Sequence, residues 1–130
     1  MTERPSSLIA AKVRSLVDRA EFDEAGRVFS KLEERRPLAP AELVSWGRII
    51  QLGSGQSATL EDAERKFKKA LEVDDEYIPA LIELGWFHHA VRDDTKCGLD
   101  YFKRALAIIH RLREEAERGR DECIAELSCD

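Results

Sequence analysis

A pattern of small and aromatic residues recurs three times along the chain, and this recurrence most constrains the fold. Each copy has a small residue, a phenylalanine four positions later and an apolar residue three positions after that. The copies are Ala25-Phe29-Leu32, Ala63-Phe67-Ala70 and Gly98-Phe102-Ala105. Spacings of three and four residues place side chains on one face of an α-helix. The recurrence therefore predicts three similar amphipathic helices.

A second pattern precedes two of these helices and predicts further helices over most of the chain. Leu43, Trp46, Gly47 and Ile50 match Leu81, Leu84, Gly85 and His88 in spacing. No segment alternates with the period of two that a strand requires. We predict an all-α fold with seven helices, at about 6–20, 22–35, 39–53, 58–73, 77–92, 94–118 and 119–128.

These residue types and spacings resemble the tetratricopeptide repeat (TPR), a helix–turn–helix unit of about 34 residues. The resemblance covers repeats at about 4–37, 40–75 and 78–111. It implies a single domain over 1–130, an α-solenoid of antiparallel helix pairs in a right-handed superhelix. The remaining residues, 112–130, are expected to form a C-terminal extension and a capping helix.

Close approach between paired helices explains the small residues of the pattern. Ala25, Ala63 and Gly98 are expected to face the first helix of their own pair, and Gly47 and Gly85 to face the second. The aromatic residue of each copy is expected to fill the wider gap to the next repeat.

The spacing between copies exceeds the family period in two places. Ala63 follows Ala25 by 38 residues and Gly98 follows Ala63 by 35. The extra residues are expected in turns, four within 53–59 and one near 93–95, because turns tolerate insertion. Helix N-caps are expected nearby, at Thr59 together with Asp62 and at Asp93 or Asp94.

Charge and composition exclude several functional classes. The chain has 21 basic and 26 acidic residues, and residues 114–130 hold seven acidic residues against two arginines. This balance argues against nucleic-acid binding, which needs clustered cations. The acidic run is either a solvated helix face or an attraction for a basic partner.

The sequence shows no pattern typical of a membrane span, a signal peptide or a disulfide framework. No stretch approaches the ~20 apolar residues of a membrane span, and the first residues lack the order of a signal peptide. Three cysteines at irregular spacing do not form a disulfide framework. We therefore expect a cytoplasmic protein with no membrane association.

No group of residues at catalytic or metal-binding spacing is evident, so we predict no catalytic residue, no metal and no cofactor. His88 and His89 are adjacent and point about 100° apart on a helix. His88 is expected in the core or at its boundary, and His110 in solvent. Cys97 lies in no CxxC pair and has no histidine at metal-ligand spacing in the sequence, so a structural role is expected.

The resemblance implies a concave face, lined by the first helix of each repeat, that binds a peptide or helix of a partner. Carried over residue by residue, this face would bind through Arg14, Asp18, Arg48, Gln51, Ile82, Trp86 and His89. Trp86 is expected either to be free for binding or to be covered by the C-terminal helix. Trp46 is expected to pack within its own repeat. The Lys/Asn/Arg clamp of chaperone-binding members is missing, which argues against recognition of chaperone tails.

The sequence therefore predicts a non-catalytic protein–protein interaction module. Two alternatives remain. One is a small immunity or inhibitor-type protein that neutralises a cognate protein, and the other is a scaffold that self-associates as a homo-oligomer.

Overall fold

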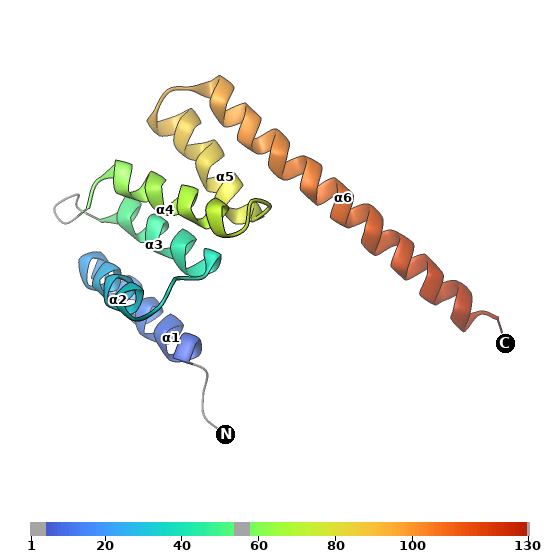
Figure 1. The fold of residues 1–130 in the computed structure, drawn as a ribbon, viewed down its shortest axis with the longest axis horizontal. Helices are drawn as coiled ribbons and strands as arrows, with labels where there is room; N and C mark the ends of the chain where they lie inside the picture. The colour runs from blue at the N-terminus through green and yellow to red at the C-terminus, as the bar shows by residue number, and fades with distance from the viewer. Residues whose placement is uncertain (1–4, 54–57, 130) are drawn as a thin grey trace.

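A computed structural model describes residues 5–53 and 58–129, and over these residues the chain is helical, without a strand. The predicted all-α fold is therefore confirmed. The elements, shown in Figure 1, are α1 (Pro5–Asp18), α2 (Phe22–Arg35), α3 (Pro40–Leu52), α4 (Leu60–Val73), α5 (Ile78–Trp86), a π-helical turn η1 (Phe87–Val91) and α6 (Thr95–Leu127).

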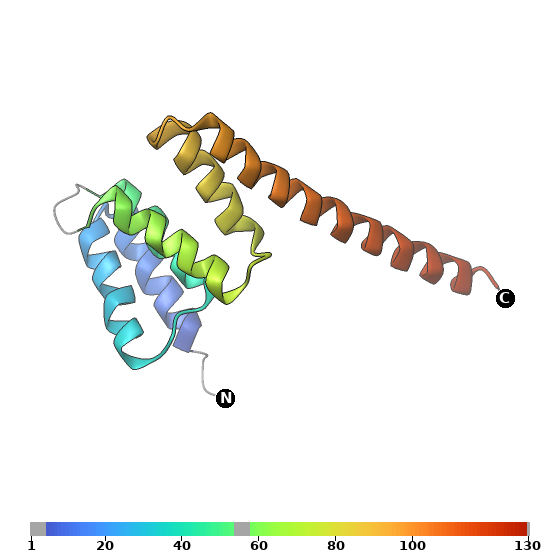
Figure 2. The same ribbon diagram turned by 45° about the horizontal axis from the view of Figure 1, so that its top comes forward.

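Each helix packs against the next one in the chain, and α3 also contacts α5. Helices α1 to α5 and the start of α6 form the body, and the rest of α6 extends away from it (Figures 1 and 2). The core follows the predicted small and aromatic positions, since Ala25, Phe29, Ala63 and Phe67 are all buried. None of the described helices combines the length and the apolar composition that crossing a membrane demands.

The glycines of α3 and α5 allow aromatic rings to lie directly on the helix backbone. A Cβ added to Gly47 would lie 2.5 Å from the Phe67 ring, and one added to Gly85 would lie 2.7 Å from the Phe102 ring. The predicted close approach is therefore confirmed within the α3–α4 and α5–α6 pairs. The structure adds that these rings pack inside their own pair, on the glycine, whereas we had assigned them to the gap before the next repeat.

The first turn of α6 approaches α5 even more closely. A Cβ on Gly98 would lie 2.7 Å from the backbone oxygen of Gly85. Any side chain at Gly98 would therefore force the two helices apart.

The predicted N-caps are present. The Thr59 hydroxyl accepts a hydrogen bond from the Asp62 N–H, and the Thr59 N–H donates to the Asp62 carboxylate at 2.8 Å. Asp94 caps α6 by accepting from the Cys97 N–H at 3.1 Å. The turn that was expected to hold four extra residues lies mostly at 54–57, outside the described residues.

The helix before the turn at 93–95, where one extra residue is predicted, contains a π-helical turn. The Arg92 N–H donates to the Phe87 carbonyl, a bond across five residues that defines the π-helical turn. A π turn holds one residue more than an α turn and is rare outside functional or strained positions. The chain therefore has a bulge at the end of α5.

The predicted break at Gly119 is wrong, and so is the predicted separate helix over 119–128. Helix α6 runs without interruption to Leu127. A glycine inside a helix costs about 1 kcal/mol, which is too little to end a helix flanked by strong helix formers. No residue of 112–129 is buried, so this segment does not fold back as a cap.

Candidate partner-binding cavity

A cavity of about 530 Å³ lies between α1 and α3, and Phe29 of α2 also contributes to its lining. Its walls are mostly apolar. The lining residues are Ile9, Ala10, Val13, Arg14, Val17, Phe29, Ala41, Glu42, Ser45, Arg48, Ile49 and Leu52.

Small side chains contribute to the lining of the cavity on both α1 and α3. Ala10 on α1 and Ala41 on α3 are both exposed and too short to fill the space. Val13, Phe29 and Ile49 are buried beneath them and belong to the core. The cavity is therefore an opening onto the core that an apolar side chain of a partner could fill.

Two of its three charged residues are already paired. Arg36 donates two hydrogen bonds to Glu42, at 2.9 and 2.8 Å, and these hydrogen bonds lower the pKa of the Glu42 carboxyl. Arg48 pairs with Glu83 on α5 at 2.6 Å, which ties α3 to α5. Arg14 makes no ion pair with any described residue and is exposed. Among the described residues, the Arg14 charge is therefore the one at this cavity that no ion pair compensates.

The structure brings only part of the predicted site together. Arg14 and Arg48 line the cavity. Asp18 is the last residue of α1 and is exposed, and Gln51 is half-buried on α3, and neither lines the cavity. Ile82 is half-buried on α5 and does not line the cavity either.

Trp86 and His89 form a separate surface at the end of α5. Trp86 is 56% exposed, so the C-terminal helix does not cover it, although its ring meets Phe102 edge-on at 5.2 Å. Its ring centroid lies 6.2 Å from that of His89. His89 Nδ1 lies 3.1 Å from the Thr95 hydroxyl. These residues do not share the α1–α3 cavity.

Trp46 contacts both its own pair and the preceding one. Its ring stacks on Phe29 of α2 with centroids 6.1 Å apart, and Lys66 of α4 lies 3.8 Å over it. The prediction of packing within one repeat is therefore only part of what the structure shows.

The resemblance also predicts a concave-face position for Ala10, Val17, Ala41 and Leu52, and all four line the cavity. It does not predict the apolar residues Ile9 and Val13, which complete the wall on α1. Ile9, Val13 and Val17 are spaced by four residues on α1, which is a recognisable helical stripe. An apolar stripe of this kind on a helix predicts burial. The pattern alone cannot distinguish residues buried in the core from residues that line an opening onto it. The relative placement of α1 and α3 decides between the two.

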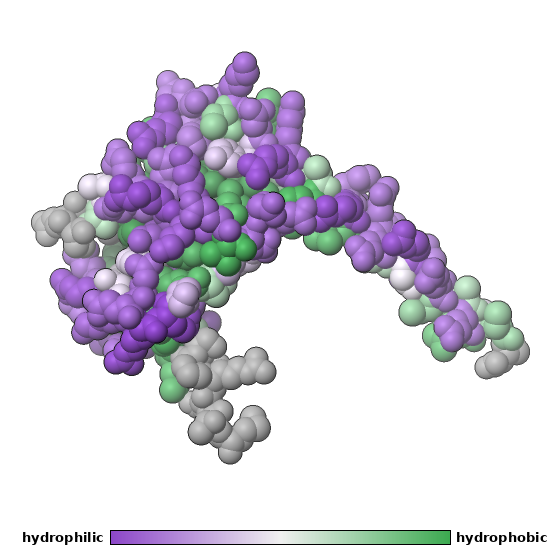
Figure 3. Space-filling model, in the orientation of Figure 1, coloured by the Kyte–Doolittle hydropathy of each residue, from purple (hydrophilic) through white to green (hydrophobic). Residues whose placement is uncertain are grey.

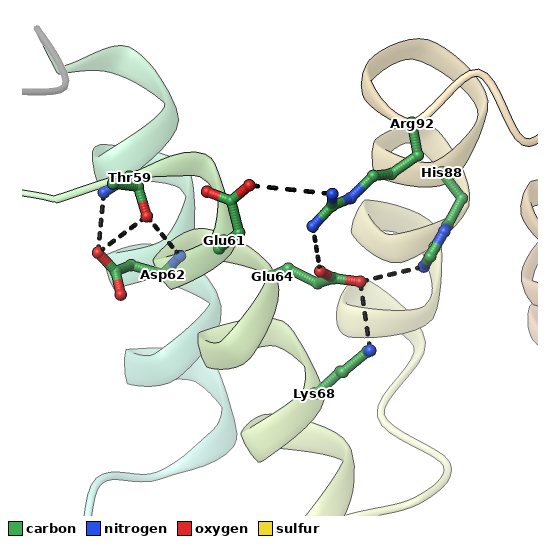
Figure 4. A network of polar contacts seen from close by, with 7 residues as sticks. All are labelled: Thr59, Glu61, Asp62, Glu64, Lys68, His88 and Arg92. Carbon is green, nitrogen blue, oxygen red and sulfur yellow. Dashed lines mark hydrogen bonds and ion pairs between the residues drawn. The ribbon is translucent and has the colours of Figure 1, made fainter.

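A second group of polar side chains connects α4 to the π-helical turn, with Glu64 of α4 at its centre (Figure 4). Arg92 donates to Glu64 at 2.9 Å, and Lys68 lies 3.2 Å from the same carboxylate. Burial alone would raise the pKa of Glu64, but the hydrogen bonds from Arg92 and Lys68 outweigh it and lower the pKa.

His88 lies at the edge of this network, as the core or boundary imidazole that we expected. Its ring stacks on Tyr101 with centroids 5.4 Å apart. Its Nε2 atom is buried and 3.4 Å from Glu64, but it makes no hydrogen bond because the geometry is poor.

The turn also brings His88 close to Asp94 and Cys97, and one donor atom from each lies within 4.8 Å of the others. Burial raises the pKa of the Cys97 thiol, and the charge of Asp94 raises it further. The sequence did not reveal this proximity because nine residues and a turn separate His88 from Cys97.

Comparison with known proteins gives no assignment for the chain. No protein-family model matches it, and no curated protein matches it in sequence.

Proposed function

We propose that this chain is a non-catalytic interaction module of the TPR type, which binds a segment of a partner protein in the α1–α3 cavity. The proposed architecture is a solenoid of antiparallel helix pairs with a right-handed superhelical twist. Support comes from the repeated packing of a phenylalanine ring on a glycine backbone, once in α3–α4 and once in α5–α6. An identical contact in successive pairs is what a repeat architecture requires.

The single observation that carries the function is the apolar cavity together with Arg14 at its edge, which forms no ion pair with any of the described residues. Buried apolar anchors and arginine are the groups that contribute most to binding at protein interfaces. The cavity takes one or two apolar side chains, and Arg14 favours a nearby acidic residue in the same segment. The proposed ligand is therefore a peptide or helix with apolar anchors and at least one carboxylate.

A displayed library of random peptides, selected on the purified chain, tests the proposal. We expect selected peptides to combine apolar and acidic residues. Ala10→Trp fills the cavity and should weaken their binding by at least about tenfold, the equivalent of 1.4 kcal/mol. Ala11→Trp is the matched control, because Ala11 is the exposed neighbour on α1 that does not line the cavity.

Charge provides a second matched pair. Arg14→Glu should weaken binding, while Lys12→Glu makes the same charge change on α1 outside the cavity and should not. Equal affinity of the selected peptides for both variants of either pair would rule out this cavity, and a library that yields no binder would count against the proposed function.

Self-association is a second candidate, which the free half of α6 favours. Leu112, Ala116, Gly119, Cys123 and Leu127 follow one another at spacings of three and four residues and are all exposed. They continue the face on which Gly98 and Ala105 pack against the body. Figure 3 shows hydrophobic surface near the far end of this helix.

Sedimentation velocity separates the two candidates. A self-associating chain sediments as a dimer or larger species, and removal of residues 113–130 returns it to a monomer. A chain that stays monomeric at high concentration, with or without these residues, excludes self-association through α6.

A further inference from the structure

The turn between η1 and α6 holds three side chains of metal-binding type in a fixed arrangement. The Asp94 N–H donates to the His88 carbonyl at 2.8 Å, and the Asp94 carboxylate accepts from the Cys97 N–H at 3.1 Å. These two bonds fix the backbone of all three residues relative to one another. The arrangement depends on the π-helical turn, which carries His88.

The donor atoms are close enough for one ion to join them. One atom from each side chain lies within 4.8 Å of the others. In tetrahedral coordination, bond lengths of 2.0 to 2.3 Å place neighbouring donors about 3.3–3.8 Å apart. Small side-chain rotations of His88, Asp94 and Cys97, with shifts of about 1 Å, would close the site without moving either helix.

The chemistry of the donors selects the ion. Imidazole nitrogen, thiolate sulfur and carboxylate oxygen together suit Zn²⁺, whereas Ca²⁺ and Mg²⁺ require oxygen ligands. We propose that His88, Asp94 and Cys97 form a binding site for a divalent transition-metal ion of the Zn²⁺ type. The fourth position is left for water or for a donor from a bound partner.

The surroundings of His88 resemble those of a metal-ligating histidine more than those of a core residue. Stacking on Tyr101 fixes the plane of the ring, and Glu64 lies 3.4 Å from Nε2 without a hydrogen bond. A ligand histidine donates its second ring N–H to a carboxylate, a carbonyl or water, which orients the ring. Glu64 is the carboxylate that would accept from Nε2 once the ring has turned onto an ion bound at Nδ1. Arg92 and Lys68 in turn hold Glu64 in place (Figure 4).

Binding requires no redox step. The thiol of Cys97 releases one proton to solvent as the metal–sulfur bond forms, and His88 coordinates as the neutral imidazole. The ion would join η1 to the first turn of α6, so we expect it to stabilise the last helix pair. This inference does not depend on the proposed partner binding.

Titration of the reduced full-length chain with Co²⁺ tests the site, because Co²⁺ reports thiolate coordination by its absorption. We expect a sulfur-to-cobalt charge-transfer band in the near ultraviolet that saturates at one ion per chain. Added Zn²⁺ should remove the band and should raise the melting temperature of the chain.

Variants identify the ligands. Cys97→Ser should abolish the band, whereas the double variant Cys123→Ser, Cys129→Ser should retain it, since both of those cysteines are exposed on α6 or beyond it. Asp94→Asn keeps a side chain that caps helices well but removes the negative charge. It should therefore leave the fold intact and weaken Co²⁺ binding by more than about tenfold, the least effect expected for loss of a ligand.

Three results would overturn the proposal. The first is the absence of a charge-transfer band in the wild-type chain, and the second is a band that survives Cys97→Ser. The third is unchanged affinity in Asp94→Asn and in His88→Gln, with both variants shown to be helical by circular dichroism.

Discussion

At the scale of single residues, two glycines set the distance between paired helices. The Phe67 ring occupies the space that a side chain at Gly47 would need, and Phe102 does the same at Gly85. The sequence predicted that these positions are close contacts, because a small residue recurs where a bulky one would suit a helix better. Which ring fills each contact depends on side-chain packing, which residue spacing does not specify.

The close contact at Gly47 makes a quantitative prediction. Alanine stabilises a helix interior by about 1 kcal/mol relative to glycine, but overpacking a core costs about 1–3 kcal/mol. Gly26→Ala should show the first effect alone, since the nearest atom to its added Cβ lies 3.6 Å away. We expect Gly47→Ala to be less stable than Gly26→Ala by about 1–3 kcal/mol in urea unfolding. Equal stability of the two variants would contradict the observed packing.

At the scale of elements, the link between α2 and α3 depends on a paired carboxylate. Glu42 has a side chain that is 15% exposed and accepts two hydrogen bonds from Arg36 and one from the Ala39 N–H. Its pKa is lower in the folded chain than in the unfolded one, chiefly because of the bonds from Arg36. The unfolded state therefore takes up this proton first as the pH falls.

The sign of this shift predicts how stability depends on pH. Glu42→Gln should cost about 1 kcal/mol at neutral pH, where the wild-type carboxylate is ionised in both states. The difference between wild type and variant should shrink as the pH falls below about 4, the ordinary range of a glutamate. Glu34→Gln, on the exposed face of α2, is the control and should show no such trend in urea unfolding at several pH values. A difference that persists or grows in acid would contradict this account.

For helix α6, the sequence pattern predicted where the helix begins but not where it ends. Its start at the Asp94 cap was predictable from cap chemistry and helical periodicity. Its continuation through Gly119 was not predictable. Glycine often follows the last residue of a helix, but its presence alone does not end a helix. The bulge at Phe87–Val91 was also not predictable. Residue spacing reveals that one residue is extra, but it does not show whether that residue lies in a loop or in a π-helical turn.

The free half of α6 should exchange its amide hydrogens quickly. An isolated helix of about 12–15 residues is only marginally stable in water, and residues 113–127 pack against no core residue. Hydrogen exchange of the monomeric chain should therefore show little protection at 113–127 and strong protection in α4. Strong protection at 113–127 would show that this segment is covered in solution and would favour self-association.

At the scale of the whole molecule, the fold class and the paired contacts follow from residue spacing, but the α1–α3 cavity does not. Arg14 and Arg48 were predicted through a resemblance, and both line the cavity. Trp86 and His89 came from the same reasoning and lie on another surface, next to Phe102 and Thr95. Trp86 is in α5 and His89 in η1, whereas every residue that lines the cavity belongs to α1, α2 or α3, so the predicted face is divided between two surfaces.

Chemical-shift mapping of a library-selected peptide onto the isotope-labelled chain tests the central claim most directly. We predict that backbone amide shifts concentrate in 8–18 of α1 and 40–52 of α3, and that Ala10→Trp removes them while Ala11→Trp does not. Shifts confined to α6 or to the surface around Trp86, or shifts that persist in Ala10→Trp, would contradict binding in the α1–α3 cavity.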